Sequence, residues 1–156
     1  MEFSQLIDQY AAGPKLLRDA VAGMTAEEIR ARPVPGKWST LEVVAHIADF
    51  EPVYACRIKR ILAEENATLL SGDPDLFAAR LKYDLRDLEE ELSLIDATRR
   101  HITRILRNCA ESDFARTGTH SSEGPLSLGE VLRRIAGHIP HHVRFIQEKR
   151  EALARG

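Results

Sequence analysis

Apolar residues recur at intervals of three and four along almost the whole chain, and this repeat marks one face of an α-helix. It is clearest in residues 3–21, 39–65, 81–109 and 127–152. No segment shows the strict alternation of apolar and polar residues that indicates a half-buried strand. Helices with one apolar stripe bury it against one another, so the pattern predicts an all-α, four-helix bundle. We expect a single domain over residues 1–156.

Capping boxes predict where two of these helices begin. Ser39 with Glu42, and Ser127 with Glu130, have the S-x-x-E spacing. In this motif each side chain satisfies a backbone N–H group that the first turn leaves free. We therefore expect the second and fourth helices to start at these serines.

Prolines and loop-forming residues predict the interruptions. Gly13-Pro14 predicts a kink or a short first turn in the first helix, and Pro52 predicts a bend in the second. Residues 66–80 read as a connection with room for one short helical turn, and residues 111–126 read as a loop by composition.

Charge and cysteine usage exclude several classes of protein. The net charge is -2, and the basic segments 57–60 and 98–107 have acidic neighbours, so we interpret them as solvated helix faces and expect no nucleic-acid partner. No apolar run approaches the roughly 18 residues of a membrane span, and the N-terminus does not resemble a signal peptide. Cys56 and Cys109 form no CxxC motif. We expect a cytoplasmic protein with two reduced thiols, independent of membranes.

Histidines occupy apolar-stripe positions on two of the predicted helices. The stripe of the fourth helix has steps of 3, 4, 3, 4 and 3, through Leu128, Val131, Ile135, His138, His142 and Phe145. His138 and His142 therefore leave one face on successive turns, whereas His141 lies on the flank. His46 lies at the edge of the stripe of the second helix.

Two histidines four residues apart on a helix form a chelating pair, because their side chains leave the helix side by side. Neutral imidazole suits Zn²⁺, Ni²⁺, Fe²⁺ and Co²⁺, and a third histidine from a facing helix leaves a coordination position open. The alternative is a set of partly buried histidines hydrogen-bonded to their neighbours. Pro140 lies between the pair; it either opens the backbone at Ala136 or offsets the ligand spacing.

Two segments carry a family resemblance: GKWSTLEVVAHIADFE at 36–51 and LSLGEVLRRIAGHIPHHVRFI at 126–146. Together they resemble the DinB-like family, also called the DinB/YfiT-like metalloenzymes. The matching positions of the first segment are Trp38, Ser39, Glu42, His46, Asp49 and Glu51. Those of the second are His138 and His142, with the family's final Gln-Ile in reversed order as Ile146-Gln147.

The resemblance implies a four-helix bundle in which three histidines hold a divalent metal, zinc or nickel, and it often implies a homodimer. Matched position by position, the ligands are His46, His138 and His142. Relatives include S-transferases and isomerases that use a low-molecular-weight thiol, and others described as hydrolases. The implied substrate is a small molecule.

Five residues near these histidines are candidates for supporting roles. Asp49 and Glu42 are positioned to orient the His46 ring from behind, although helix capping already explains Glu42. Tyr54 and Arg57 are candidates to line a substrate pocket, with core packing and surface charge as the alternative. His120, in the predicted loop, either overhangs the mouth of the site or is simply exposed.

Three hypotheses follow from the sequence. The leading one is a metal-dependent enzyme that transfers a small thiol to an electrophile or hydrolyses a small substrate. The second is a non-enzymatic bundle whose metal stabilises the fold. The third has no metal, and its imidazoles form a buried polar network.

Overall fold

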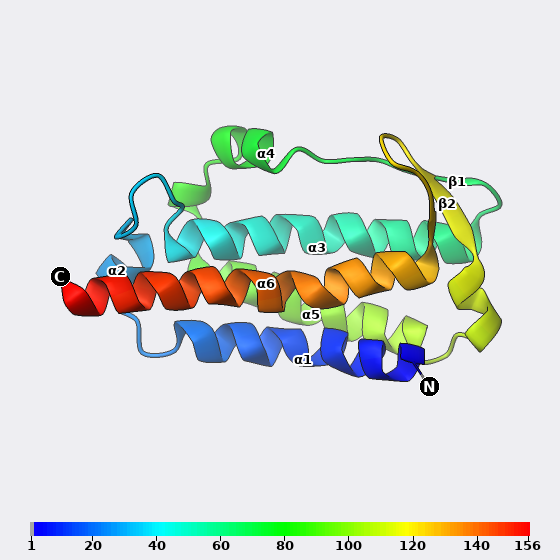
Figure 1. Ribbon diagram of the computed structural model, residues 1–156, viewed down its shortest axis with the longest axis horizontal. Coiled ribbons are helices and arrows are strands. Elements are labelled where there is room, and N and C mark those ends of the chain that lie inside the picture. The colour runs from blue at the N-terminus through cyan, green and yellow to red at the C-terminus, as the bar shows by residue number, and fades with distance from the viewer. Residues whose placement is uncertain (1) are drawn as a thin grey trace.

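Four long helices lie side by side in the computed structural model, which describes residues 2–156 (Figure 1). They are α1 (Glu2–Val21), α3 (Thr40–Ala63), α5 (Leu88–Leu106) and α6 (Leu128–Arg155), with the short α2 (Ala26–Arg30) between the first two. Helices α1 and α3 each pack against both α5 and α6. This arrangement confirms the predicted four-helix bundle, and it places the α1–α5 seam opposite the α3–α6 seam.

The connectivity is not a simple up-and-down arrangement. Helices α3 and α5 are consecutive long helices, yet they run in the same direction, while α1 and α6 run in the other (Figure 1). The chain therefore returns along the bundle between residues 64 and 87. This crossover contains β1 (Ala67–Leu69), α4 (Pro74–Arg80) and the 3-10 turn η1 (Tyr83–Leu85). It passes over α3 and places α4 above the N-terminal half of that helix.

A small sheet, absent from the sequence prediction, closes one end of the bundle. Strand β2 (Thr117–His120) pairs in parallel with β1 and antiparallel with β3 (Gly124–Ser127). The segment predicted as a loop, 111–126, therefore contains β2, most of β3 and the 3-10 turn η2 (Glu111–Ala115). These strands have three or four residues, too few for an alternating pattern to stand out.

Local capping explains where the helices begin. The Ser39 hydroxyl accepts from the Glu42 N–H and the Glu42 carboxylate accepts from the Ser39 N–H, as predicted. Ser127 caps α6 by accepting from the Glu130 N–H. Helix α5 starts at Leu88 and not near residue 81, because Asp87 provides the cap.

The prolines lie inside continuous helices, so the first helix does not end in a short first turn at Gly13-Pro14, whereas a kink there stays a prediction. Proline at position 14 has no N–H to donate to the carbonyl of Tyr10, four residues earlier. Arg99 of α5 supplies the missing donor: its Nη1 lies 2.8 Å from the Tyr10 carbonyl oxygen. A partner from another helix therefore compensates for the lost bond.

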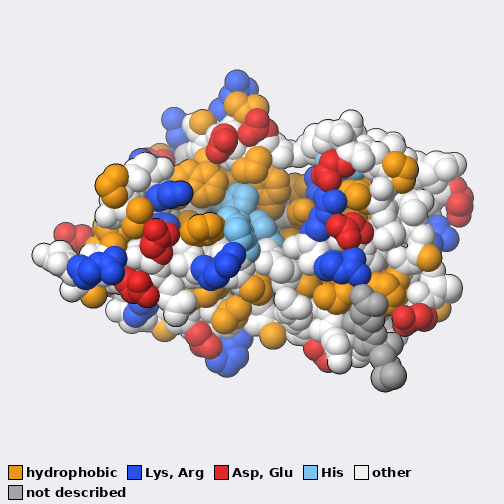
Figure 2. Space-filling view, in the orientation of Figure 1, with side chains coloured by type: hydrophobic (Ala, Val, Ile, Leu, Met, Phe, Trp, Pro, Cys, Tyr) orange, Lys and Arg blue, Asp and Glu red, His pale blue; other side chains and the backbone are white. Residues whose placement is uncertain are grey.

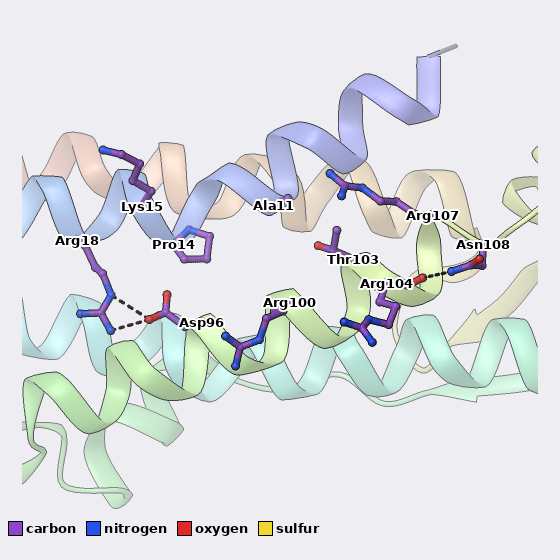
Figure 3. A pocket seen from close by; sticks show the side chains of 10 residues that line it. All are labelled: Ala11, Pro14, Lys15, Arg18, Asp96, Arg100, Thr103, Arg104, Arg107 and Asn108. Carbon is purple, nitrogen blue, oxygen red and sulfur yellow. Dashed lines mark hydrogen bonds and ion pairs between the residues drawn. The ribbon is translucent and has the colours of Figure 1, made fainter.

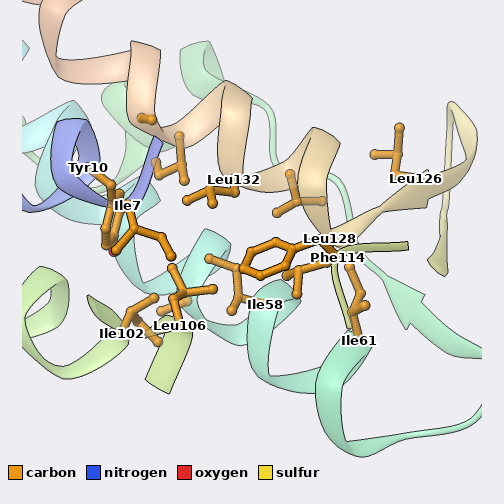
Figure 4. Packing of buried hydrophobic residues seen from close by; sticks show 14 of the residues in the cluster. Ile7, Tyr10, Ile58, Ile61, Ile102, Leu106, Phe114, Leu126, Leu128 and Leu132 are labelled. Atoms are coloured by element: carbon orange, nitrogen blue, oxygen red, sulfur yellow. The ribbon is translucent and has the colours of Figure 1, made fainter. Parts of the chain in front are cut away.

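A buried polar pair separates two apolar clusters. One cluster lies at the sheet end, where Ile58, Leu106, Phe114 and Leu128 meet (Figure 4). The other, which includes Leu17, Ile47, Ile95 and Ile139, lies towards the opposite end. Between them along α3 and α5 are the oppositely charged Glu51 and Arg99, with 0% and 1% of their side chains exposed.

Arg99 binds all three of the other long helices. Its Nε and Nη2 donate to Glu51 Oε1 on α3, at 2.9 and 2.6 Å. Its Nη1 reaches the Tyr10 carbonyl on α1, and Nη2 reaches the Ile135 carbonyl on α6 at 2.9 Å. The prediction that segment 98–107 is a solvated face is thus wrong for this residue.

We predict that Gly13→Ala destabilises the protein, by about 1–3 kcal/mol as expected for overpacking. A Cβ at Gly13 would overlap Arg99 Nη1, so the buried guanidinium group would have to move. Gly137→Ala is the matched control, because a Cβ there meets nothing within 4 Å and alanine is the better helix former. Urea denaturation of both variants tests this, and equal free energies of unfolding would contradict it.

No helix within residues 2–156 is long and apolar enough to cross a membrane.

Candidate metal centre

The bundle brings together three imidazoles from two helices that are far apart in the sequence. His46 lies on α3, and His138 and His142 lie one turn apart on α6. The Nε2 atoms of His46 and His138 are 3.1 Å apart. One ring nitrogen from each of the three histidines lies within 4.8 Å of the other two. The faces predicted for these histidines therefore meet in the fold.

The spacing and the donor set fit a divalent transition metal. Tetrahedral bonds of about 2.0–2.1 Å hold ligand nitrogens about 3.3 Å apart, so only small ring movements would complete such a site. Within residues 2–156, no fourth His, Cys, Asp or Glu joins the group. His141 is exposed, and its Nδ1 lies 3.1 Å from Arg144 Nη2. A metal held by the three histidines would keep a coordination position open.

Burial keeps all three imidazoles neutral at physiological pH. It lowers the pKa of His46 to about 4, of His142 to about 3 and of His138 to about 2. Repulsion between the rings lowers the pKa of His138 and His142 further. Neutral imidazole is the form that binds a metal, so a metal ion would not have to displace a proton from any of the three ligands.

The ring nitrogens of these histidines have few hydrogen-bond partners. In the described part of the chain, the Nδ1 atoms of His46, His138 and His142 are buried and accept or donate no hydrogen bond. Buried polar atoms are usually satisfied. The one contact between the rings joins the Nε2 atoms of His46 and His138, so a hydrogen-bonded histidine network, the no-metal alternative, would leave these three Nδ1 atoms unpaired.

The two carboxylates expected behind His46 bind arginines. Both Asp49 oxygens lie 3.1 Å from nitrogens of Arg86, on the loop before α5. Glu42 caps α3 and forms an ion pair with Arg32. Neither therefore orients the His46 ring by a hydrogen bond, although the charge of Asp49 opposes the fall in the pKa of His46.

Aromatic side chains position the His46 ring instead. The Trp38 ring centroid is 5.3 Å from that of His46, and the Phe50 centroid is 4.9 Å away on another side. Phe77 of α4 packs on Phe50 at 5.1 Å, so the crossover supports this wall from above. Sequence reasoning did not single out Phe50 and Phe77. Phe50 lies one turn beyond His46 on the same stripe, and this is the one signal that could have indicated it.

The histidines lie in the floor of a hollow. Figure 2 shows them at its centre, with hydrophobic side chains around them and charged groups further out. A pocket of about 290 Å³ adjoins His142, and its other lining residues are Gly36, Lys37, Trp38, Val43, Asp75, Phe145 and Lys149. This volume is at the lower end of the range for small-molecule sites.

Lys149 is the least expected member of this pocket. Only 2% of it is exposed; its Nζ donates to the Phe145 carbonyl at 3.2 Å, and burial lowers its pKa. A buried ammonium beside the histidines gives the pocket one cationic wall. It lies on α6 seven residues after His142 and so shares the stripe of the ligand pair, which is the one signal in the sequence that indicates it.

Tyr54, Arg57 and His120 do not line this pocket. Tyr54 and Arg57 lie about 12 and 16 Å further along α3 than His46, at 1.5 Å per residue. Arg57 lies over the Tyr54 ring at 4.7 Å and donates to the Leu70 carbonyl at 2.6 Å. His120 is on β2 and is 5% exposed, so it is not the solvent-exposed loop residue of the alternative reading.

We predict that the metal-free protein loses stability as the pH falls from about 6.5 towards 4. An unfolded histidine has a pKa of about 6.5, whereas His46 in the folded state titrates near 4, so the unfolded state binds more protons in this window. Each such group contributes a slope of up to about 1.4 kcal/mol per pH unit. Urea denaturation with a chelator present, from pH 7.5 to 4.5, measures the slope.

The control for this prediction is the triple variant with His46→Gln, His138→Gln and His142→Gln, which lacks the titrating groups. It should show a shallower fall in the free energy of unfolding. Equal slopes in the two proteins would show that other groups, such as ion-paired carboxylates, cause the acid sensitivity.

Comparisons with known proteins agree with this geometry. The sequence model of the DinB superfamily matches residues 9–146. A protein of Oceanobacillus iheyensis named "Putative metal-dependent hydrolase" is 30% identical over 133 residues, covering 85% of this chain and 77% of its own. A Bacillus licheniformis protein with the same name is 25% identical, over 97% and 87% of the two chains.

Solved structures share the fold. YfiT of Bacillus subtilis, described as a probable metal-dependent hydrolase with an unusual four-helix bundle topology, superposes with a TM-score of 0.89 at 24% identity. The match covers 97% of this chain and 87% of YfiT. The four-helix bundle protein TT2238 matches with a TM-score of 0.66 at 23% identity, over 93% and 98% of the chains.

Proposed function

The chain belongs to the DinB superfamily, and we propose that it is a metal-dependent hydrolase of a small molecule whose metal is held by His46, His138 and His142. The observation that carries the proposal is the set of three neutral imidazoles, clustered within 4.8 Å and without a fourth ligand in residues 2–156. Imidazole donors select a transition metal over magnesium or calcium, and zinc or nickel is the metal proposed.

A divalent ion bound there supplies Lewis acidity, which polarises a carbonyl oxygen and makes water more acidic. The chain's own contribution is positioning. His138 and His142 are fixed one turn apart by α6, and His46 is held between Trp38 and Phe50. The hydrophobic rim limits water around the ligands, and the pocket beside His142 gives a small substrate a place next to the open position.

The buried ammonium of Lys149 adds a specific role. It lies in the wall of the pocket that adjoins His142, with Lys37 also in the lining. Two cationic groups and one carboxylate, Asp75, line the pocket beside an apolar wall of Trp38 and Phe145, so the net positive charge favours a substrate with a negative group at one end. Lys149 would hold that group and thereby orient the reacting bond.

Transfer of a low-molecular-weight thiol is the second candidate. Imidazole-bound zinc or nickel also accepts a thiolate, which is the nucleophilic form of a thiol. Neither free cysteine of the chain lines the pocket, since Cys56 is exposed on α3 and Cys109 donates to the Ile105 carbonyl. The thiol would therefore be a cosubstrate, in keeping with a cytoplasmic location.

A homodimer forms part of the proposal. Exposed leucines are spread along the crossover, from Leu70 after β1 to Leu85 in η1, with Leu76 in α4 and Leu81 at its end, and we propose that those from α4 to η1 contact a second copy. Sedimentation velocity of the wild type beside Leu76→Lys and Leu85→Lys tests whether this surface joins two copies.

The function is tested on a panel of small esters, lactones and amides, with and without a low-molecular-weight thiol. Chelated protein should be inactive, and Zn²⁺ or Ni²⁺ should restore turnover. Lys149→Gln should raise the KM for anionic substrates more than for neutral ones. Activity only in the presence of thiol would select the transferase. Metal-loaded protein that is stabilised by the ion but inactive across the panel would favour a structural metal.

A further inference from the structure

A second concave site lies on the far side of the bundle from the histidines. A groove of about 700 Å³ runs between α1 and α5, opposite the α3–α6 seam (Figure 3). Its lining residues are Ala11, Pro14, Lys15, Arg18, Asp96, Arg100, Thr103, Arg104, Arg107 and Asn108. The volume is within the usual range for small-molecule sites.

Small residues explain why the two helices leave a hollow here. Ala11 and Pro14 face the groove from α1, and Thr103 faces it from α5. The seam positions deeper in the bundle carry larger side chains, such as Tyr10 and Ile102. The helices are therefore in contact below the groove and separated by small side chains above it.

Five cations line this groove, and two of them have no acidic partner. The paired cations are Lys15 with Asp19, Arg18 with Asp96 and Glu89, and Arg107 with Asp8. Within residues 2–156, neither Arg100 nor Arg104 forms an ion pair, and Figure 3 shows both along one face of α5. Like charges four residues apart on a helix repel each other. An anion between these guanidinium groups would relieve that repulsion.

An independent feature lies in the floor of the same groove. Thr103 is only 8% exposed, and its buried hydroxyl has no hydrogen-bond partner in the described part of the chain. Figure 3 shows its side chain between α1 and α5, in the space bordered by the arginines. An unpaired buried hydroxyl is destabilising, and an acceptor oxygen in the groove would satisfy it.

We propose that this groove binds a small phosphorylated molecule, with Arg100 and Arg104 donating to its phosphate oxygens and Thr103 donating from below. The planar guanidinium group matches phosphate because it donates two parallel hydrogen bonds. Two arginines one helical turn apart suit a ligand with two linked phosphates. The groove shares no residue with the metal centre, so this proposal can be tested independently of the proposed hydrolase activity.

Calorimetric titration of metal-free protein with inorganic pyrophosphate tests the site, because pyrophosphate would also bind a metal. At about 50 mM salt, where exposed charges are weakly screened, we expect saturable binding that weakens as salt is added. The variant Arg100→Gln/Arg104→Gln should weaken binding tenfold or more, since each lost charge-assisted hydrogen bond is worth about that factor. The control Arg80→Gln/Arg155→Gln removes the same charge from exposed sites outside the groove and should change binding less than about twofold.

The isosteric variant Thr103→Val removes the hydroxyl and keeps both arginines, so it measures the contribution of the hydroxyl alone. It should weaken pyrophosphate binding several-fold while leaving the protein at least as resistant to urea as the wild type. Absence of saturable binding, or equal losses in the groove and control variants, would overturn the proposal. Binding of duplex DNA or anionic vesicles without binding of pyrophosphate would also overturn it.

Discussion

Replacing any one of His46, His138 and His142 by alanine is expected to weaken Zn²⁺ binding by at least about 100-fold. Removing a group that only supports a metal ligand costs 10–100-fold, so removing the ligand itself costs more. Each variant leaves two imidazoles, which cannot hold the ion against solvent as three can. Elemental analysis of protein purified without chelator, followed by competition with a chromophoric chelator, measures the loss.

His141→Ala is the matched control. This histidine lies next to His142 on the same helix, but it is exposed and outside the cluster. Its variant should keep the metal content of the wild type. Wild-type protein should also unfold at higher urea concentration when Zn²⁺ is added, by about 2.7 kcal/mol at a free concentration 100 times the Kd. Near-stoichiometric metal in all four variants would refute the assignment of the ligands.

Arg99→Met is expected to destabilise the protein by about 3–5 kcal/mol, a large part of the stability of a domain. The substitution leaves the Glu51 carboxylate fully buried without a counterion, and it leaves the Tyr10 carbonyl, four residues before Pro14, without a donor. Arg100→Met, at the next position and exposed, should change the free energy of unfolding by less than about 0.5 kcal/mol.

A second substitution and a change of pH each test whether the unpaired Glu51 carboxylate causes this loss of stability. Burial already raises the pKa of Glu51 in the wild type, and Arg99 opposes that rise. Without Arg99, the folded-state pKa lies further above the unfolded value, so the variant should gain stability as the pH falls below the folded pKa. Glu51→Leu in the Arg99→Met background should recover much of the loss, since well-packed apolar groups often replace a buried ion pair without cost. A double variant as unstable as Arg99→Met would contradict this account.

The buried ion pair and the metal centre are neighbours. Arg99 binds the Ile135 carbonyl, three residues before His138, and its charge lowers the pKa of that histidine. The four-helix contact of Arg99 therefore holds the backbone from which two of the three histidines project. Loss of metal affinity in Arg99→Met, measured under conditions where the variant is folded, is the expected consequence.

The local half of the site was predictable from the sequence. The spacing of His138 and His142 places both rings on one face of one helix, whatever the helix packs against. The Ser39 and Ser127 caps were likewise predictable, because they depend on groups within three residues. His46 was a candidate because it lies at the edge of a second apolar stripe, and the family resemblance then implied that it is the third ligand, since spacing cannot tell which helix faces α6.

The errors share a cause. Arg99 lies in a basic segment whose charge pattern matches a solvated helix face, yet it is 1% exposed, and its partners come from α1, α3 and α6. Strands β1 and β2 pair across about 50 residues, and each is too short to show a pattern. The groove that the unpaired arginines line exists only because α1 packs beside α5, and the sequence alone does not show that contact.

By itself, the sequence determined the helices, their capped starts and the residues that share each face, because the α-helical repeat is set by backbone hydrogen bonds over four residues. The tertiary structure alone decided which faces meet. That choice joined His46 to His138, 92 positions later, buried Arg99 among four helices and directed Asp49 to Arg86. These contacts depend on burial and electrostatics between distant segments, which a repeat of three and four residues does not encode.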